Sequence, residues 1–245
     1  MASLEAMHCS ATDNSGNDER VIVTLLTMTL VTGFVDAVSY LGPGHVFTAN
    51  MTGNIALLGF AIAGAPRLSI ARALISLFAF VLGAILGGRL GLTFPASDRR
   101  SWVLRVAACE AALLFVAALA CAGLKSSSGA SASRVYVVIV LTAVAMGLRT
   151  AAMRRLAATD IRTTVVTSTL AALAGDSSLA GGDNQHLGRR VGAVLAMLVG
   201  AAIGTLLLRF GLGMPLLLGG ILVLGVTSAC AWLPSSLAAA DNSHL

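Results

Sequence analysis

Two stretches of this sequence join a long apolar run to a short segment rich in hydroxyl and amide side chains. The first short segment carries Thr48, Asn50, Thr52 and Asn54. The second, about 115 residues later, carries Thr163, Thr164 and Thr167. Polar groups at membrane depth are costly and usually mark a pathway or a binding site. Paired, short, glycine-interrupted segments in two halves of a chain are typical of a transporter's binding site.

Asp36 lies about 15 residues into the first apolar run. It shares a stripe with Thr29, Thr32, Ser39 and Tyr40. Spacings of three and four residues place these side chains on one helix face. Asp36 is therefore either an ion or proton site or a structural residue that caps backbone or pairs with an arginine. Arg149 stands near the matching place in the second half, and we expect the two to pair.

The segment from Thr48 to Asn54 is polar on two sides. At about 100° per residue, Thr48 and Thr52 share one helix face, whereas Asn50 and Asn54 share nearly the opposite one. Such a helix must be enclosed by other helices. The preceding run 42–44, Gly-Pro-Gly, breaks the chain and leaves helix-start amides that bind anionic groups readily. The alternative is a packed helix whose polar groups only bridge its neighbours.

Glu110 lies near the middle of another apolar run. It is either a carboxyl that burial keeps protonated or a proton-coupling group. A basic cluster follows in the second half: Arg149, Arg154, Arg155 and Arg162. Arginines of this kind anchor the topology or contact lipid headgroups, and the alternative is attraction of a substrate.

Composition assigns the class of protein. Hydrophobic residues make up 57% of the chain and charged residues only 11%, and the mean hydropathy is +0.88. A span needs about 20 mostly apolar residues, and no period-2 alternation typical of membrane strands appears. We therefore predict an all-α polytopic membrane protein. The candidate segments are 21–41, 46–64, 69–89, 102–123, 135–156, 161–174, 189–209 and 213–233.

Length and charge predict which segments cross. Segment 161–174 has about 14 residues, roughly 21 Å of helix, which is too short to span comfortably. If it and segment 46–64 re-enter without crossing, most basic residues fall on one side, and the positive-inside rule places both termini in the cytoplasm. Six crossings then remain, in two halves of about 21–123 and 135–233 related as an inverted repeat. We expect the protein in the bacterial inner membrane.

The remaining features indicate what the chain lacks. Residues 1–20 read as a disordered cytosolic tail and 234–245 as a short polar tail. The four cysteines form no C-x-x-C pair, so we expect neither a metal nor a cofactor. The net charge of +5 lies in short loops, which argues against nucleic-acid binding. No nucleotide-binding or catalytic motif is present, so we do not expect an enzyme.

Several motifs resemble the YoaK family of bacterial multi-pass membrane proteins, a domain of unknown function. They are Gly33-Phe-Val-Asp36-Ala, Phe47-Thr-Ala-Asn50-Met-Thr52-Gly53-Asn54, and Arg154-Arg-Leu followed by Arg162-Thr163-Thr164-Val-Val-Thr167. The resemblance covers roughly residues 20–232. Ser168 departs from it, because a glycine is expected after the second threonine. The resemblance implies a membrane location and no established activity.

We therefore expect a secondary transporter of a small solute, coupled to H⁺ or Na⁺, whose two short segments meet around a polar cavity. The alternative is a non-transporting membrane scaffold or a lipid- or partner-binding module, in which the polar segments only specify packing. Membrane lipids and a small solute or ion are the expected partners. Two GxxxG pairs, Gly83/Gly87 and Gly200/Gly204, predict close helix packing and are candidate faces for an oligomer.

Overall fold

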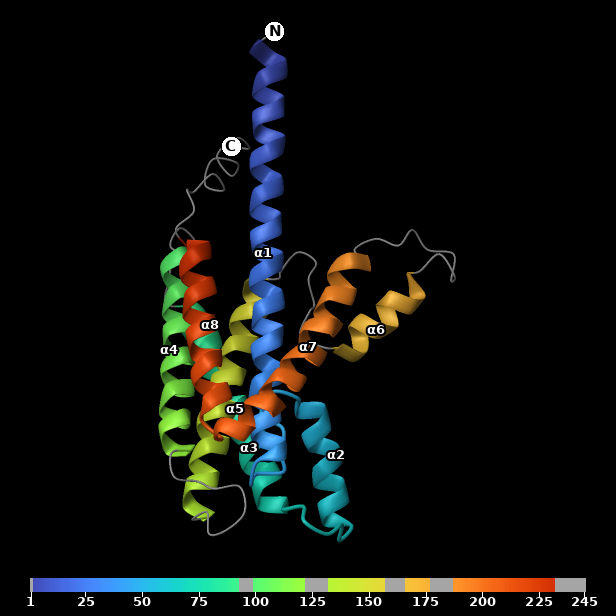
Figure 1. Cartoon of the computed structure of the whole chain (residues 1–245), viewed down its shortest axis with the longest axis vertical. Coiled ribbons are helices and arrows are strands. Elements are labelled where there is room, and N and C mark those ends of the chain that lie inside the picture. Colours follow the sequence, from blue (N-terminus) through green and yellow to red (C-terminus); the bar gives the residue numbers. More distant parts are fainter. Residues whose placement is uncertain (1, 93–98, 122–131, 157–165, 177–186, 232–245) are drawn as a thin grey trace.

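A computed structural model describes residues 2–92, 99–121, 132–156, 166–176 and 187–231 of the chain (Figure 1). Its regular structure over these ranges is helical, which confirms the predicted class. The elements are α1 (Ala2–Leu41), α2 (Met51–Ile62), α3 (Ile70–Leu92), α4 (Arg99–Cys121), α5 (Ala132–Leu156), α6 (Val166–Gly175), α7 (Leu187–Leu207), a 3₁₀ turn η3 (Leu208–Phe210) and α8 (Met214–Ala231).

The distribution of side chains is that of a membrane protein. Large apolar side chains face outward, including Phe78 (70% exposed), Leu119 (70%) and Leu198 (64%). Several polar side chains are instead buried between the helices. Apolar side chains face lipid without cost, whereas polar groups at that depth need partners inside the protein. By length and composition, α3, α4, α5, α7 and the Ile22–Leu41 part of α1 can cross a membrane.

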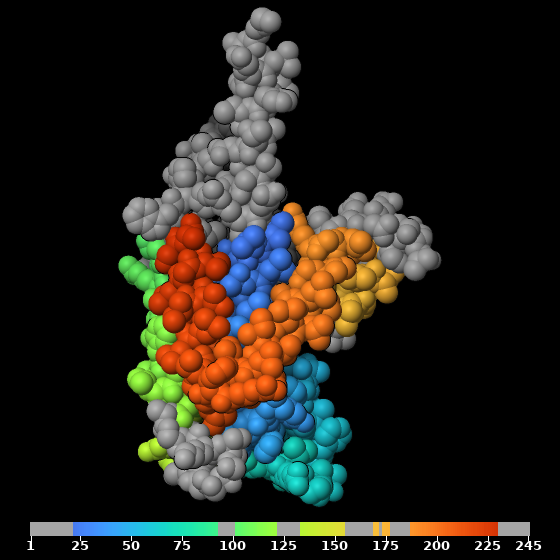
Figure 2. All heavy atoms as spheres, in the orientation of Figure 1, coloured from blue at the N-terminus to red at the C-terminus, as the bar shows by residue number. Residues whose placement is uncertain are grey.

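Three shorter helices complete the described bundle. α8 has 18 residues and packs along α4 and α1. α2 and α6, with 12 and 10 residues, lie against α3 and α7 respectively. In Figure 1, α1, α4 and α7 run down the page, whereas α3, α5 and α8 run up it. Figure 2 shows α7 crossing the face of α1 obliquely, so that part of α1 is visible between α7 and α8.

The apolar core lies where α1, α4, α5 and α8 meet. Fully buried side chains there include Val35, Leu114, Leu216 and Val223. The chain approaches α4 closely just before α8, since a Cβ placed on Gly213 would lie 2.8 Å from the carbonyl oxygen of Ala118. These four helices form the central bundle. α7 packs on α1, and α3 packs on α5.

Glycines let two pairs of helices approach backbone to backbone. A Cβ placed on Gly200 of α7 would lie 2.2 Å from the carbonyl oxygen of Leu30 on α1. A Cβ placed on Gly83 of α3 would lie 2.2 Å from that of Val144 on α5. The close packing predicted for the glycine pairs is confirmed. Because helices of the same chain occupy both faces, neither is free for a second copy.

The structure differs from expectation at two places. Residues 2–20 are helical and continuous with α1, whereas a disordered tail was predicted. Extending an existing helix costs far less than nucleating one, and this stretch contains no proline. The second segment begins at Met51 rather than at residue 46, and the preceding residues form an irregular loop.

Candidate functional site

The chain turns back into the protein after α1. Gly42 N–H donates to the carbonyl of Val38 at 3.0 Å and closes the helix. Val46 N–H then donates to the carbonyl of Ser39 at 3.4 Å, so the loop runs back beside α1. α2 begins after this return and descends to the level where α3 starts (Figure 1). This course fits a segment that re-enters rather than crosses, and the re-entry stays a prediction.

Asp36 holds the returning loop. Its Oδ1 accepts the backbone N–H of Thr48 at 3.2 Å and that of Ala49 at 3.0 Å. The side chain is buried, with 5% of Asp36 exposed. These two loop amides therefore donate to a carboxyl group of the same chain, and the predicted binding of an anionic group at the start of α2 stays a prediction. Two oxygens at this junction have no hydrogen-bond partner: Asp36 Oδ2 and Thr48 Oγ1.

Asn54 ties the loop to α2 and α3. Its Oδ1 accepts the N–H of Phe47 at 2.8 Å, and its Nδ2 donates to the carbonyl of Phe47. Nδ2 also donates to Ser76 Oγ at 3.0 Å. Ser76 Oγ in turn donates to the carbonyl of Phe47 at 2.7 Å. Asn54 and Ser76 are fully buried, so this network satisfies backbone that would otherwise be unpaired at membrane depth.

The other two candidates in the first segment lie outside that network. Asn50 is exposed and caps α2, because its Oδ1 accepts the N–H of Gly53 at 3.2 Å. Thr52 is also exposed. The predicted pairing of faces is wrong, because Thr48 lies in the loop and not on the helix that carries Thr52. Among the residues that sequence reasoning missed, Ser76 was detectable as a polar residue inside an apolar run.

A second buried site joins three helices. Arg149 of α5 forms an ion pair with Glu110 of α4 through Nη2. Its Nη1 donates to the carbonyl of Met28 at 2.8 Å and to Thr32 Oγ1 at 3.1 Å, both on α1. Its Nε has no partner. The expected pair between Arg149 and Asp36 does not form, because Glu110 on a neighbouring helix takes the guanidinium instead.

The two sites lie on one face of α1. Thr32 contacts Arg149, and Asp36, four residues further, holds the loop. Four residues correspond to about 6 Å along a helix. Of the polar stripe predicted on α1, Asp36 and Ser39 are buried and Thr32 contacts Arg149, whereas Tyr40 is exposed. Thr32 and Asp36 contact two different partners one turn apart.

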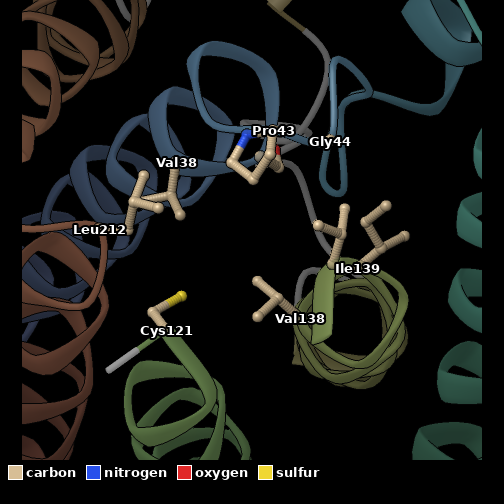
Figure 3. A pocket seen from close by; sticks show the side chains of 9 residues that line it. Val38, Pro43, Gly44, Cys121, Val138, Ile139 and Leu212 are labelled. Atoms are coloured by element: carbon tan, nitrogen blue, oxygen red, sulfur yellow. The ribbon is translucent and has the colours of Figure 1, made fainter. Parts of the chain in front are cut away.

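The cavity found beside the loop is small and mostly apolar. Its volume is about 20 Å³, close to what one water molecule needs. Figure 3 shows Val38, Pro43, Cys121, Val138 and Leu212 around it. None of the predicted site residues lines this cavity. It is therefore not the polar cavity expected between the two short segments.

The second half of the predicted site is only partly described. Thr163 and Thr164 lie outside the described residues, and for Thr167, on α6, the side chain is also outside them. Within the described ranges, no three His, Cys, Asp or Glu side chains gather closely enough to hold a metal ion.

These features define a polytopic α-helical membrane protein with buried charged side chains and a polar loop held against its first helix. The chain belongs to the family described as "Protein of unknown function (DUF1275)", whose model matches residues 24–229. It is 38% identical over 159 residues to the UPF0700 transmembrane protein YoaK of Bacillus subtilis (strain 168), which covers 63% of this chain and 67% of that protein. No solved structure matches the chain.

Proposed function

We propose that this protein is a secondary transporter of a small solute, built from two inverted halves and coupled to H⁺ or Na⁺. One observation carries the proposal: each half packs one of its long helices against the other half. α3 packs on α5, and α7 packs on α1, so each half lends a helix to the other.

The two exchanged contacts match residue by residue. Gly33 on α1 faces Met197 and Ala201 of α7. Gly147 on α5 faces Phe80 and Ala84 of α3, and these two precede Met197 and Ala201 by the same 117 residues. The equivalent contacts support an internal repeat far better than the sparse sequence matches do.

The partners on the other side of each contact match as well. Gly200 and Gly204 of α7 contact Leu30 and Phe34 of α1. Gly83 and Gly87 of α3 contact the residues 114 positions after those two, which are Val144 and Leu148 of α5. The same contact positions recur in both helix pairs over two helical turns. Two unrelated GxxxG contacts would not be expected to match in this way.

The matched helices run in opposite directions. α1 runs down Figure 1 and α5 runs up, and α3 and α7, like α4 and α8, are opposed in the same way. This arrangement supports a twofold axis in the membrane plane. Inverted repeats of this kind can exchange conformations, and many carriers use that exchange for alternating access.

Buried charge supports coupling to an ion. Asp36 and Glu110 are carboxylates inside segments long enough to span the membrane, and both are buried. Carboxylates at that depth are costly and usually belong to ion or proton pathways.

The arginines support an orientation. The ends of α3, α4, α5 and α7 that meet at one side carry Arg89, Arg99, Arg100, Arg105, Arg154, Arg189 and Arg190. The opposite side carries Arg67, Arg72, Arg134 and Arg209. By the positive-inside rule, the first side faces the cytoplasm, together with both termini, in a bacterial inner membrane.

One observation favours a second candidate, a membrane scaffold that transports nothing. Most polar groups of the re-entrant segment are satisfied by one another, as in the network of Asn54, Phe47 and Ser76. Polar groups that only specify packing need no substrate.

Spin-label distances separate the two candidates without knowledge of the solute. Leu92→Cys with Leu187→Cys reports one end of the molecule, and Ile70→Cys with Phe210→Cys reports the other; all four positions are exposed. For a carrier in liposomes, we expect two distance populations per pair, whose proportions shift in opposite senses at the two ends when pH or Na⁺ changes. Single, unchanged distances at both ends would contradict the proposal and favour the scaffold.

A further inference from the structure

The two buried carboxylates of the membrane-spanning helices are not balanced in the same way. Glu110 has the guanidinium of Arg149 as its counter-charge. Asp36 is also buried, but within the part of the chain that the structure describes it pairs with no charged side chain, and its Oδ1 accepts the uncharged N–H groups of Thr48 and Ala49. Arg72 of α3 also reaches this loop, but its Nη1 donates to the carbonyl of Pro43 at 2.7 Å. A buried carboxylate without a counter-charge is costly, and a bound cation removes that cost.

Two unpartnered oxygens lie at this junction. Asp36 Oδ2 and Thr48 Oγ1 are buried and accept or donate no hydrogen bond, so they are not bonded to each other. They belong to residues joined by the hydrogen bond from Thr48 N–H to Asp36 Oδ1 at 3.2 Å. A cation can bridge oxygens that are too far apart to share a hydrogen bond, whereas a proton on one of them cannot.

The C-terminal end of α1 favours a positive charge near this junction. Asp36 lies about a turn and a half before the end of α1 at Leu41, and the C-terminal end of a helix carries partial negative charge. The irregular loop that follows presents peptide groups free of helical pairing. Unwound backbone next to a helix end is a common Na⁺ site in transporters.

We propose that Asp36 and Thr48 form a Na⁺ site, with Asp36 Oδ2 and Thr48 Oγ1 as ligands. The amide bonds to Oδ1 orient the carboxylate, and the ion links the end of α1 to the re-entrant loop. The inference deepens the proposed function, because it names the coupling ion, and it rests on that function only for the role of the ion. The site itself can be tested by binding alone.

The test is thermal unfolding of the full chain in detergent, with NaCl compared with choline chloride and KCl at equal ionic strength. A ligand that binds only the folded state raises the unfolding midpoint in a saturable way, by several degrees at about 100 times its dissociation constant. We expect this rise in Na⁺ and not in choline or K⁺.

Two variants locate the site, and one is a matched control. Asp36→Asn retains an oxygen for the two amides but removes the charge, and Thr48→Val removes the hydroxyl with little change in shape. Each should lose at least half of the Na⁺-dependent rise. Thr205→Val, on the exposed face of α7, should keep all of it.

Three outcomes would overturn the proposal: no Na⁺-dependent rise in the parent chain, an equal rise in K⁺, or a full rise in Thr48→Val. A rise that follows acidification instead of Na⁺ would assign the junction to a proton, against this inference. Because none of these readouts involves transport, a failed carrier test with intact Na⁺ binding would remove the proposed function alone.

Discussion

Arg149 and Glu110 form an ion pair in which both side chains are almost fully enclosed, with 6% and 1% of their surface exposed. The pair joins α5 to α4, and the same guanidinium reaches α1 through Met28 and Thr32. Removing charges from solvent is costly, so a buried pair contributes less to stability than its short contact suggests.

Replacing one member of the pair should lower the free energy of unfolding more than replacing both members. Arg149→Met leaves Glu110 buried without a counter-charge, and the expected loss is about 3–5 kcal/mol in the free energy of unfolding. The double variant Arg149→Met/Glu110→Leu should recover most of that loss. Denaturant unfolding in mixed micelles measures both. A double variant as unstable as the sum of the two single variants would show that the residues do not act on each other.

The exchanged glycine contacts predict a steric effect. Gly83→Ala and Gly200→Ala each place a methyl group 2.2 Å from a backbone oxygen, so the helices must separate, at an expected cost of about 1–3 kcal/mol. Gly225→Ala is the matched control, because a Cβ there meets nothing within 4 Å. It should be neutral or slightly stabilising, since alanine favours a helix over glycine. Equal midpoints for the three variants would contradict the packing described here.

The two asparagines of the re-entrant segment should differ. Asn54→Ala leaves the N–H of Phe47 without its partner and removes a donor from Ser76 Oγ, and an unsatisfied buried group costs about 1–3 kcal/mol. Asn50→Ala removes one exposed cap, worth about 1 kcal/mol. We therefore expect a clearly lower unfolding midpoint for Asn54→Ala. A larger effect of Asn50→Ala would indicate that Asn50 has a partner beyond this loop.

Side-specific labelling checks the re-entrant topology. In a background with the native cysteines replaced by serine, Ala65→Cys reports the chain just after α2, and Arg209→Cys reports the turn that follows α7. Both should react with an impermeant maleimide added to intact cells, whereas Arg154→Cys should react only after the membrane is opened. If α2 crossed the membrane, Ala65→Cys and Arg209→Cys would label from opposite sides.

The sequence alone determined the class of protein and which polar residues lie in its interior. Apolar runs of spanning length allow only helices whose backbone groups are paired internally. Against such runs Asp36, Glu110, Arg149 and Asn54 stand out as polar groups that must face the protein, and all four are buried. The short length of segment 161–174 and the distribution of basic residues also predict that the two polar segments re-enter.

Only the tertiary structure decided the partners. A helix-face argument placed Asp36 and Arg149 in matching positions of two halves, but Arg149 pairs with Glu110, whose depth on α4 follows from how α4 packs on α5. Likewise, the carboxylate of Asp36 binds amides twelve and thirteen residues further along, because the loop turns back. Periodicity along one helix specifies a direction around its axis, whereas a contact also needs the relative height of two helices, which their packing sets.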